Sequence, residues 1–246
     1  MKIGIVTQAR MTSTRLPGKV MLTVGGKSIL SHHIERLNRA GYPTFVATTT
    51  NEADDVIVVE SEAAGASSVH RGSEHDVLSR FHDVSVAEQL DVVVRVTSDC
   101  PLIDGELIRR GVDAFLHAGD NYAFVSNTLD RTFPRGLDFE VFSAIALSDA
   151  AEHATLASER EHVTPFLYAG HPRVSLHSVT THPDSSRFRI TLDTRADFDV
   201  IRALIEDHGA ATASAQQIIQ ILEANPGLVA LNADVIQKSL PGNPGV

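Results

Sequence analysis

Residues 2–19 read KIGIVTQARMTSTRLPGK. Residues 2–8 form a short apolar run that predicts a buried first strand. The loop after this run carries Arg10, Arg15 and Lys19, with small hydroxyl residues between them and a Pro-Gly turn. Open α/β sheets bind their ligands at the carboxyl ends of their strands. The stretch therefore predicts an α/β fold whose first loop holds a small polyanion.

The charge of the N-terminal segment supports this interpretation. The first 34 residues contain five basic residues and no acidic one, although the chain has a formal net charge of −10. The plain alternative is a solvated basic surface, which is common near a chain end. The Gly, Pro, Ser and Thr residues between the charges are instead typical of a loop that cradles phosphate.

Two glycine-lysine pairs in this region fall short of a Walker-type loop. Gly18-Lys19 is followed by Val20, and Gly26-Lys27-Ser28 has Met21 where the first glycine of the motif belongs. No G-x-G-x-x-G follows the first strand either. We therefore expect neither a P-loop NTPase nor a dinucleotide-binding domain, and we interpret Lys27-Ser28 as a turn and helix N-cap.

Composition limits the class of protein. The 246 residues, of which 43% are hydrophobic, suffice for one domain over residues 1–246. The acidic balance argues against nucleic acid or an anionic membrane as a main partner. A single cysteine excludes an internal disulfide and fits a reducing compartment. The first apolar run is too short for a signal peptide, and no stretch approaches a membrane span, so we expect a cytoplasmic protein.

Apolar runs and amphipathic stretches alternate along the first 118 residues. This pattern is typical of a mainly parallel sheet flanked by helices on both faces. After residue 118 the pattern becomes mixed, and residues 127–185 are expected to form a small arm on the α/β core. Residues 239–246 are expected to be an irregular end. The expected strands are 2–8, 44–49, 67–70, 91–97, 121–126, 137–142, 173–179 and 187–192, and the expected helices are 28–40, 53–65, 74–88, 143–152, 158–168 and 195–208.

A second motif, residues 95–104, ends a valine-rich strand with Ser98-Asp99. A carboxylate at the tip of a central strand is well placed to hold a divalent cation beside a nucleotide phosphate. The alternative role is a helix N-cap, but Asp104 stands directly before the next helix and fits that role better. Asp99 is therefore a candidate metal ligand, and Cys100 is expected to be a small packed residue.

Asp193 follows the expected strand 187–192 in the same way. Alone, a carboxylate at this point would be interpreted as a helix N-cap. Together with Asp99 it becomes a candidate second ligand, because two carboxylates plus substrate phosphates suit Mg²⁺.

Further chemistry-bearing residues lie in a loop and in the expected arm. Gly72-Ser73, before an amphipathic helix, offers backbone N–H groups to an anion or a base edge, and a plain loop with an N-cap is an equal alternative. Asp138 and Glu140 share one face of an expected strand, and Glu161-His162 lies at the start of a helix. The 12 histidines form no H-x-x-x-H motif, and His32-His33 is expected on a helix surface.

With these motifs, the chain resembles the cytidylyltransferases that make CMP-activated acidic sugars, most of all the SpsF-type branch of spore-coat polysaccharide synthesis. The resemblance runs from Ile5 to about Asp199. Gln8 departs from the Pro that the sugar synthetases often have, and Ser98 from the Gly that is common in SpsF-type chains. The motifs that carry the resemblance are QARxxSTRLPGK at residues 8–19, RGSExDVL at 71–78, DCPLID at 99–104, TFPxGLDxE at 132–140, ExEHVTP at 159–165 and TLDT at 191–194.

The resemblance implies a Rossmann-like nucleotidyltransferase fold and a homodimer joined through the arm. It also implies a Mg²⁺-dependent reaction of CTP with a small-molecule acceptor, an acidic sugar of the nonulosonate type, with release of pyrophosphate. The implied catalytic residues are Arg10, Lys19 and Asp99, and the implied metal ligands are Asp99 and Asp193. The implied nucleotide site comprises Gln8, Ala9, Arg10, Ser13, Arg15, Lys19, Arg71, Gly72, Ser73, Asp76 and Ser98, and the implied acceptor site comprises Arg135, Asp138, Glu140, Glu161 and His162.

Two alternatives stay open on these residues. A related nucleotidyltransferase would act on a phosphorylated or phosphonate acceptor, for which Arg131, Arg135 and Arg173 could supply the extra cations. A non-catalytic nucleotide-binding subunit would be expected to have lost Asp99 or Lys19, and this chain retains both.

Overall fold

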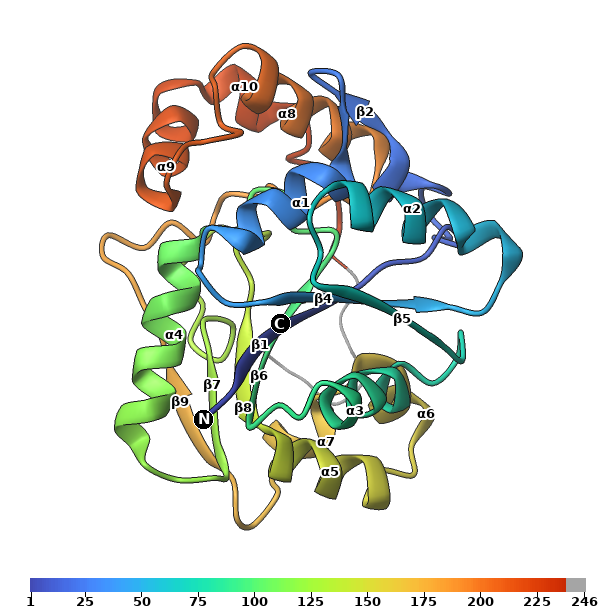
Figure 1. The fold of residues 1–246 in the computed structure, drawn as a ribbon. Coiled ribbons are helices and arrows are strands. Elements are labelled where there is room, and N and C mark those ends of the chain that lie inside the picture. Colours follow the sequence, from blue (N-terminus) through green and yellow to red (C-terminus); the bar gives the residue numbers. More distant parts are fainter. Residues whose placement is uncertain (238–246) are drawn as a thin grey trace.

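One seven-stranded sheet organises the computed structural model, which describes residues 1–237 (Figure 1). Its strand order is β5-β4-β1-β6-β8-β7-β9. The first four strands in this order run parallel, β8 runs antiparallel to both of its neighbours, and β9 is parallel to β7. The mixed, mainly parallel sheet confirms the predicted fold class. The strands are β1 (Ile3–Gln8), β4 (Thr44–Thr49), β5 (Ser68–Gly72), β6 (Val92–Thr97), β7 (Ala123–Ser126), β8 (Glu140–Ser143) and β9 (Ser175–Ser178).

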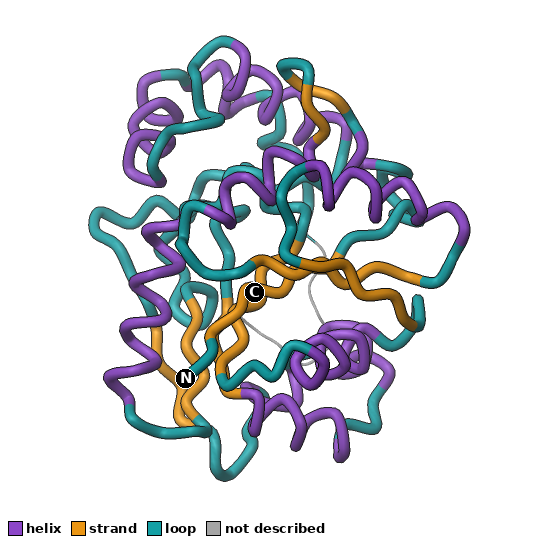
Figure 2. The backbone as a smooth tube through the Cα atoms, in the orientation of Figure 1, coloured by secondary structure: helices purple, strands orange, loops and turns teal. Residues whose placement is uncertain are grey.

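Helices pack against both faces of the sheet (Figures 1 and 2). Successive side chains of a strand point to opposite faces, so in β1 Ile5 joins one apolar core and Val6 the other. The Ile5 face is covered by α1 (Ile29–Asn38), α2 (Asp55–Ala63) and α4 (Gly105–Ala118), with α8 (Arg195–Glu206), α9 (Ala215–Ala224) and α10 (Pro226–Ala230) packed beyond them. The Val6 face is covered by α3 (Val77–Ala87), α5 (Ala144–His153), α6 (Ala157–His162) and α7 (Pro165–Tyr168).

Local sequence signals explain where the helices next to the site begin. The Ser28 hydroxyl accepts from the Ser31 N–H at the start of α1, and the Asp104 carboxylate accepts from the Glu106 N–H at the start of α4. Both caps were predicted. Cys100 is buried, as predicted. None of the helices within residues 1–237 is long and apolar enough to cross a membrane.

The prediction of a strand at residues 187–192 is wrong. Phe188, Ile190 and Leu192 are buried, which gives the segment a strand-like alternation. Its backbone nevertheless bonds to loops, since the Ile190 N–H donates to the Arg135 carbonyl at 2.7 Å and the Leu192 N–H donates to the Asp99 carbonyl at 2.8 Å. The segment is extended because it connects the site to α8.

Residues 127–185, the segment expected to form an arm, contribute two strands to the central sheet. Within this segment, β8 lies between β6 and β7, and β9 forms an edge of the same sheet. The helix expected at 158–168 is two short helices, because Val163 has a φ of 73° and Pro165 begins α7. Residues 239–246 lie outside the described residues.

The expectation of a surface position for His32-His33 is also wrong. His33 is fully buried, and its two ring nitrogens bond to the Thr7 hydroxyl at 2.9 Å and the Cys100 carbonyl at 3.0 Å. Burial lowers the pKa of His33 to about 4, so the ring is neutral and joins α1 to the loop after β6.

Candidate active site

A cavity of about 340 Å³ opens beyond the carboxyl ends of β1 and β6. This is where a parallel α/β sheet is expected to bind a ligand. Six residues that were not singled out also line it: Thr14, Val20, Val77, Arg80, Arg95 and Thr97. The predicted site residues that line it are Gln8, Ala9, Arg10, Ser13, Arg15, Lys19, Ser98, Asp99, Glu161, His162 and Asp193.

The basic loop is folded back on itself by its backbone. Gly18 has a φ of 68°, which glycine adopts readily, and its N–H donates to the Met11 carbonyl at 2.9 Å. The Met11 N–H in turn donates to the Asp54 carboxylate at 2.7 Å. Lys19 begins a single 3₁₀ turn, η1 (Lys19–Met21), directly after Gly18. The Pro-Gly turn therefore brings Lys19 back into the cavity.

The Lys19 ammonium bridges the two predicted metal ligands. Its Nζ lies 3.4 Å from Asp99 Oδ2 and 3.0 Å from Asp193 Oδ1, and it donates to the Leu192 carbonyl at 2.6 Å. Burial opposes the charge, but the two carboxylates outweigh burial and raise the pKa of Lys19. Burial would likewise raise the pKa of Asp99, yet Lys19 and the Thr97 hydroxyl lower it. Lys19 and Asp99 are therefore both charged.

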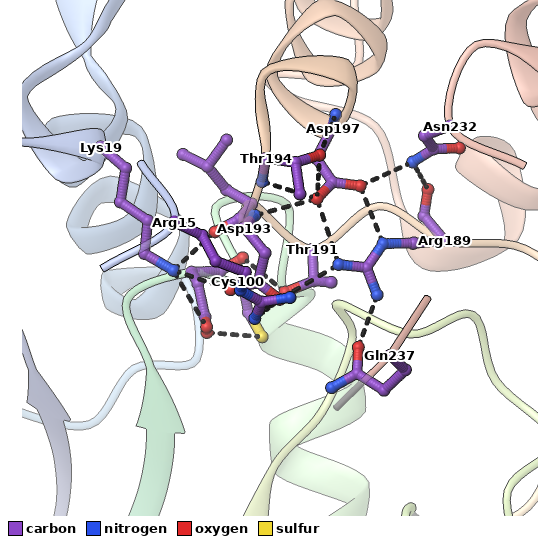
Figure 3. A network of polar contacts seen from close by, with 12 residues as sticks. Arg15, Lys19, Cys100, Arg189, Thr191, Asp193, Thr194, Asp197, Asn232 and Gln237 are labelled. Atoms are coloured by element: carbon purple, nitrogen blue, oxygen red, sulfur yellow. Dashed lines mark hydrogen bonds and ion pairs between the residues drawn. The ribbon is translucent and has the colours of Figure 1, made fainter. Parts of the chain in front are cut away.

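Asp193 is held by cations on both of its oxygens (Figure 3). Oδ1 faces Lys19, while Oδ2 meets Arg15 at 2.8 Å and Arg189 at 3.1 Å. Arg189 also pairs with the fully buried Asp197 at 2.8 Å. The N-cap of α8 is Thr194, so Asp193 does not cap the helix and its carboxylate is directed to the cavity.

The donor set fits a divalent cation of the magnesium type. Asp99 and Asp193 both come within 3.4 Å of one atom, Lys19 Nζ, so their oxygens converge on a common position. Across residues 1–237 no group of three or more potential ligands occurs. A pair of carboxylates completed by substrate phosphates and water is how Mg²⁺ is usually held.

A further part of the cavity wall is formed by α3 and by strand residues on the face that α3 covers. Gln8 lies on the same face of β1 as Val6, and Arg95 on the same face of β6 as Val93, by the period of two. Arg95 donates to Glu140 at 2.7 Å across the strand pair. Arg80 is only 4% exposed. Both arginines interrupt apolar patterns, which is the signal that could have identified them in the sequence.

The 71–76 segment supports the cavity without lining it. Arg71 donates to the carbonyls of Thr49 and Asn51, each at 2.8 Å, and pairs with Asp55. Asp76 caps α3 through the Ser79 N–H and pairs with Arg160. Gly72 and Ser73 lie between them and do not line the cavity either.

The predicted acceptor residues divide into two groups. Glu161 and His162 line the cavity, and burial lowers the pKa of His162. Glu140 lies behind Arg95 and accepts from the Thr164 hydroxyl at 3.0 Å. Asp138 accepts from both terminal nitrogens of Arg131. Burial lowers the pKa of Arg135. Neither Asp138 nor Arg135 lines the cavity.

This fold and site define a nucleotidyltransferase. A solved structure of CMP:2-keto-3-deoxy-manno-octonic acid synthetase complexed with CTP superposes with a TM-score of 0.62 at 17% identity, over 85% of this chain and 100% of that chain, which shows the shared fold. The chain belongs to the cytidylyltransferase family, whose model matches residues 3–220. It is therefore an enzyme that transfers a cytidylyl group from CTP.

Two relatives match nearly the whole chain. The spore coat polysaccharide biosynthesis protein SpsF of Bacillus subtilis is 32% identical over 235 residues, 91% of this chain and 95% of that protein. A solved cytidylyltransferase from Leptospira borgpetersenii is 33% identical and has a TM-score of 0.90, covering 97% of this chain and 100% of that chain. The resemblance to the SpsF-type branch is thereby confirmed.

Proposed function

We propose that this cytidylyltransferase transfers CMP from CTP to an acidic sugar of the nonulosonate type and releases pyrophosphate in a Mg²⁺-dependent reaction. The observation that carries the proposal is the meeting of Lys19 with Asp99 and Asp193 at one end of the cavity. Glu161 and His162 line the same cavity, where an acceptor would meet the nucleotide.

In the proposed reaction, an oxygen of the acceptor attacks the α-phosphorus in line, and the bond to pyrophosphate breaks. Negative charge builds on the leaving pyrophosphate as this bond lengthens. Arg10, Arg15 and Lys19 line the cavity as preorganised cations and would neutralise that charge. Mg²⁺ held by Asp99 and Asp193 would polarise the α-phosphate.

Two of the arginines that could bind an acceptor phosphate are already paired with carboxylates of the protein, which favours an acidic sugar over a phosphorylated or phosphonate acceptor. Arg131 is committed to Asp138, and Arg173 pairs with Asp149 and lies over the Tyr122 ring. Arg135 does not itself line the cavity, but its side chain makes no hydrogen bond or ion pair with any other residue from 1 to 237, so we assign it an acceptor carboxylate. A single cation suits one carboxylate better than a dianionic phosphate.

A panel of candidate acceptors incubated with CTP and Mg²⁺ tests this assignment, with pyrophosphate release as the readout. We expect a nonulosonate-type sugar to be the efficient acceptor. A phosphorylated alcohol as the efficient acceptor would overturn the acidic-sugar assignment and leave the cytidylyl chemistry standing. A homodimer joined through residues 127–185 and a cytoplasmic location stay predictions.

CTP is expected to bind more tightly than UTP, ATP or GTP. The site motifs are those of the cytidylyl branch, and the cavity is bounded by fixed strand and helix residues that select for shape. Calorimetric titration of each nucleotide with Mg²⁺ measures the difference, expected to be about 10-fold or more. Equal or tighter binding of a purine nucleotide would contradict this prediction.

Replacing Glu140 with glutamine is expected to raise the KM for the acceptor by about 10-fold or more and to leave the KM for CTP nearly unchanged. Glu140 fixes Arg95 and Thr164 beside the cavity, and the uncharged amide holds Arg95 less firmly. Steady-state kinetics with each substrate varied in turn measures both constants. The matched control is Glu223→Gln, a side chain at the surface of α9. Two unchanged KM values would remove Glu140 from acceptor binding.

A further inference from the structure

Arg80 is a buried cation without an adequate partner. Its side chain lines the cavity at 4% exposure, and its Nε and Nη1 have no hydrogen-bond acceptor among residues 1–237. Burial and the neighbouring Arg10 lower its pKa to about 10. A guanidinium in such a place is costly unless it is paired.

The carboxylates near Arg80 are committed elsewhere. Asp54 accepts from the Met11 N–H and the Thr49 hydroxyl. Glu74 accepts from Thr12 and Asn51 and pairs with Arg10, and Asp76 is held by Arg160. In the part of the chain that the structure describes, Arg80 therefore lines the cavity with its Nε and Nη1 donors unused.

The position of the Arg80 side chain explains why residue 72 is a glycine. Its φ is not in the left-handed region, so the backbone alone does not require glycine there. A Cβ at residue 72 would lie 2.8 Å from Arg80 Cγ, closer than real contacts allow. Glycine at this position lets the stem of Arg80 lie along the end of β5 and reach the cavity.

Gln8 presents a complementary unsatisfied atom in the same wall. None of the described residues donates a hydrogen bond to its buried Oε1, and the residue lines the cavity. Gln8 lies on the same face of β1 as Val6, and Arg80 belongs to α3, which covers that face, whereas Lys19 of the basic loop bridges Asp99 and Asp193. The wall thus offers unused donors and one unused acceptor, beside the apolar side chain of Val77.

We propose that Arg80 and Gln8 read the cytosine ring of CTP: Arg80 donates to O2 and N3, and Gln8 Oε1 accepts from the N4 amino group. A phosphate offers acceptors only and would leave Gln8 Oε1 unsatisfied. Cytosine carries both kinds of group on one edge. Uracil has a carbonyl in place of the amino group and an N–H at N3. Its O4 acceptor would therefore face the Gln8 Oε1 acceptor, and its N3–H donor would face the Arg80 donors. The inference rests on CTP as the substrate and is independent of the acceptor.

Arg80→Met keeps the length of the stem and removes the donors. We expect this variant to bind CTP about 10- to 100-fold more weakly, to lose its preference for CTP over UTP, and to bind inorganic pyrophosphate as the wild type does. Its thermal midpoint without nucleotide should rise, because an unpaired buried charge has been removed. Isothermal titration with CTP, UTP and pyrophosphate, together with a thermal melt, gives these readouts. The matched control is Arg195→Met, an exposed arginine at the start of α8.

Three outcomes would overturn the inference. An unchanged ratio of CTP to UTP affinity in Arg80→Met would remove Arg80 from base recognition. An equal loss of CTP and pyrophosphate binding would make Arg80 a phosphate ligand, and a lowered thermal midpoint would make it a structural residue. Gln8→Ala supplies a second test in a separate variant, since it should weaken CTP and spare UTP. A wild type that binds UTP as tightly as CTP would instead contradict the substrate assignment itself.

Discussion

Lys19→Ala is expected to lower turnover by about 10²- to 10³-fold and to leave the fold intact. The substitution removes a cation whose Nζ lies at 3.0 Å from Asp193 and 3.4 Å from Asp99, at the place where the leaving pyrophosphate would gather charge. Asp193 keeps Arg15 and Arg189 as partners in the variant, so the local structure should hold. Pyrophosphate release under saturating CTP measures the effect, and circular dichroism checks the fold.

Lys27→Ala provides the matched control, because Lys27 is an exposed lysine of the same segment that pairs with Glu35 and does not line the cavity. It should turn over like the wild type. Arg10→Ala should also lose about 10²-fold, since Arg10 lines the same cavity. Unchanged turnover in Lys19→Ala with a native-like spectrum would show the loop to be a solvated basic surface.

The second large effect is expected for Asp99→Asn, which should abolish Mg²⁺-dependent turnover with little loss of stability. Asparagine keeps the shape of the side chain and its contact with the Thr97 hydroxyl, but it removes the charge that would hold the metal. Asp193→Asn should have the same consequence. Turnover measured over a range of Mg²⁺ concentrations, and again in EDTA, reports on the metal directly.

Asp113→Asn, an exposed position in α4, is the control for charge alone and should not differ from the wild type. Full activity of the wild type in EDTA would remove the metal from the mechanism. A strong loss of stability in Asp99→Asn would point to a structural role for the Lys19 bridge instead.

The sequence predicts the first half of the fold well, because its strands are buried on both faces. β4 (TFVATT) is buried along its whole length and β6 (VVVRVT) carries four valines, and short runs of this kind between amphipathic stretches are typical of parallel strands. Residues 187–192 show the limit of this signal. Alternating burial reports an extended backbone, and it carries no information on whether the partner is a strand or a loop.

Two parts of the site are predictable from the sequence: the basic loop after β1, whose residues are close in sequence, and the carboxylates that directly follow extended segments. Arg80 was missed because its role depends on Gly72 and Gln8, which only the folded chain brings near it. His33 was misplaced on the surface although it shares a helix face with Ile29 and Leu37. Its burial depends on Thr7 and on the Cys100 carbonyl, and local sequence does not reveal those partners.

The network around Asp193 bears on how the enzyme would release its product. Three cations, Lys19, Arg15 and Arg189, already face carboxylates before any nucleotide arrives. Under the proposed function, an incoming triphosphate exchanges partners with Asp99 and Asp193 and does not meet bare charges. The same carboxylates compete for Lys19 and Arg15 when pyrophosphate is ready to leave. Such a site binds CTP less tightly than unpaired cations would, and it also releases pyrophosphate more readily. The arrangement therefore favours rapid turnover over tight binding of substrate or product.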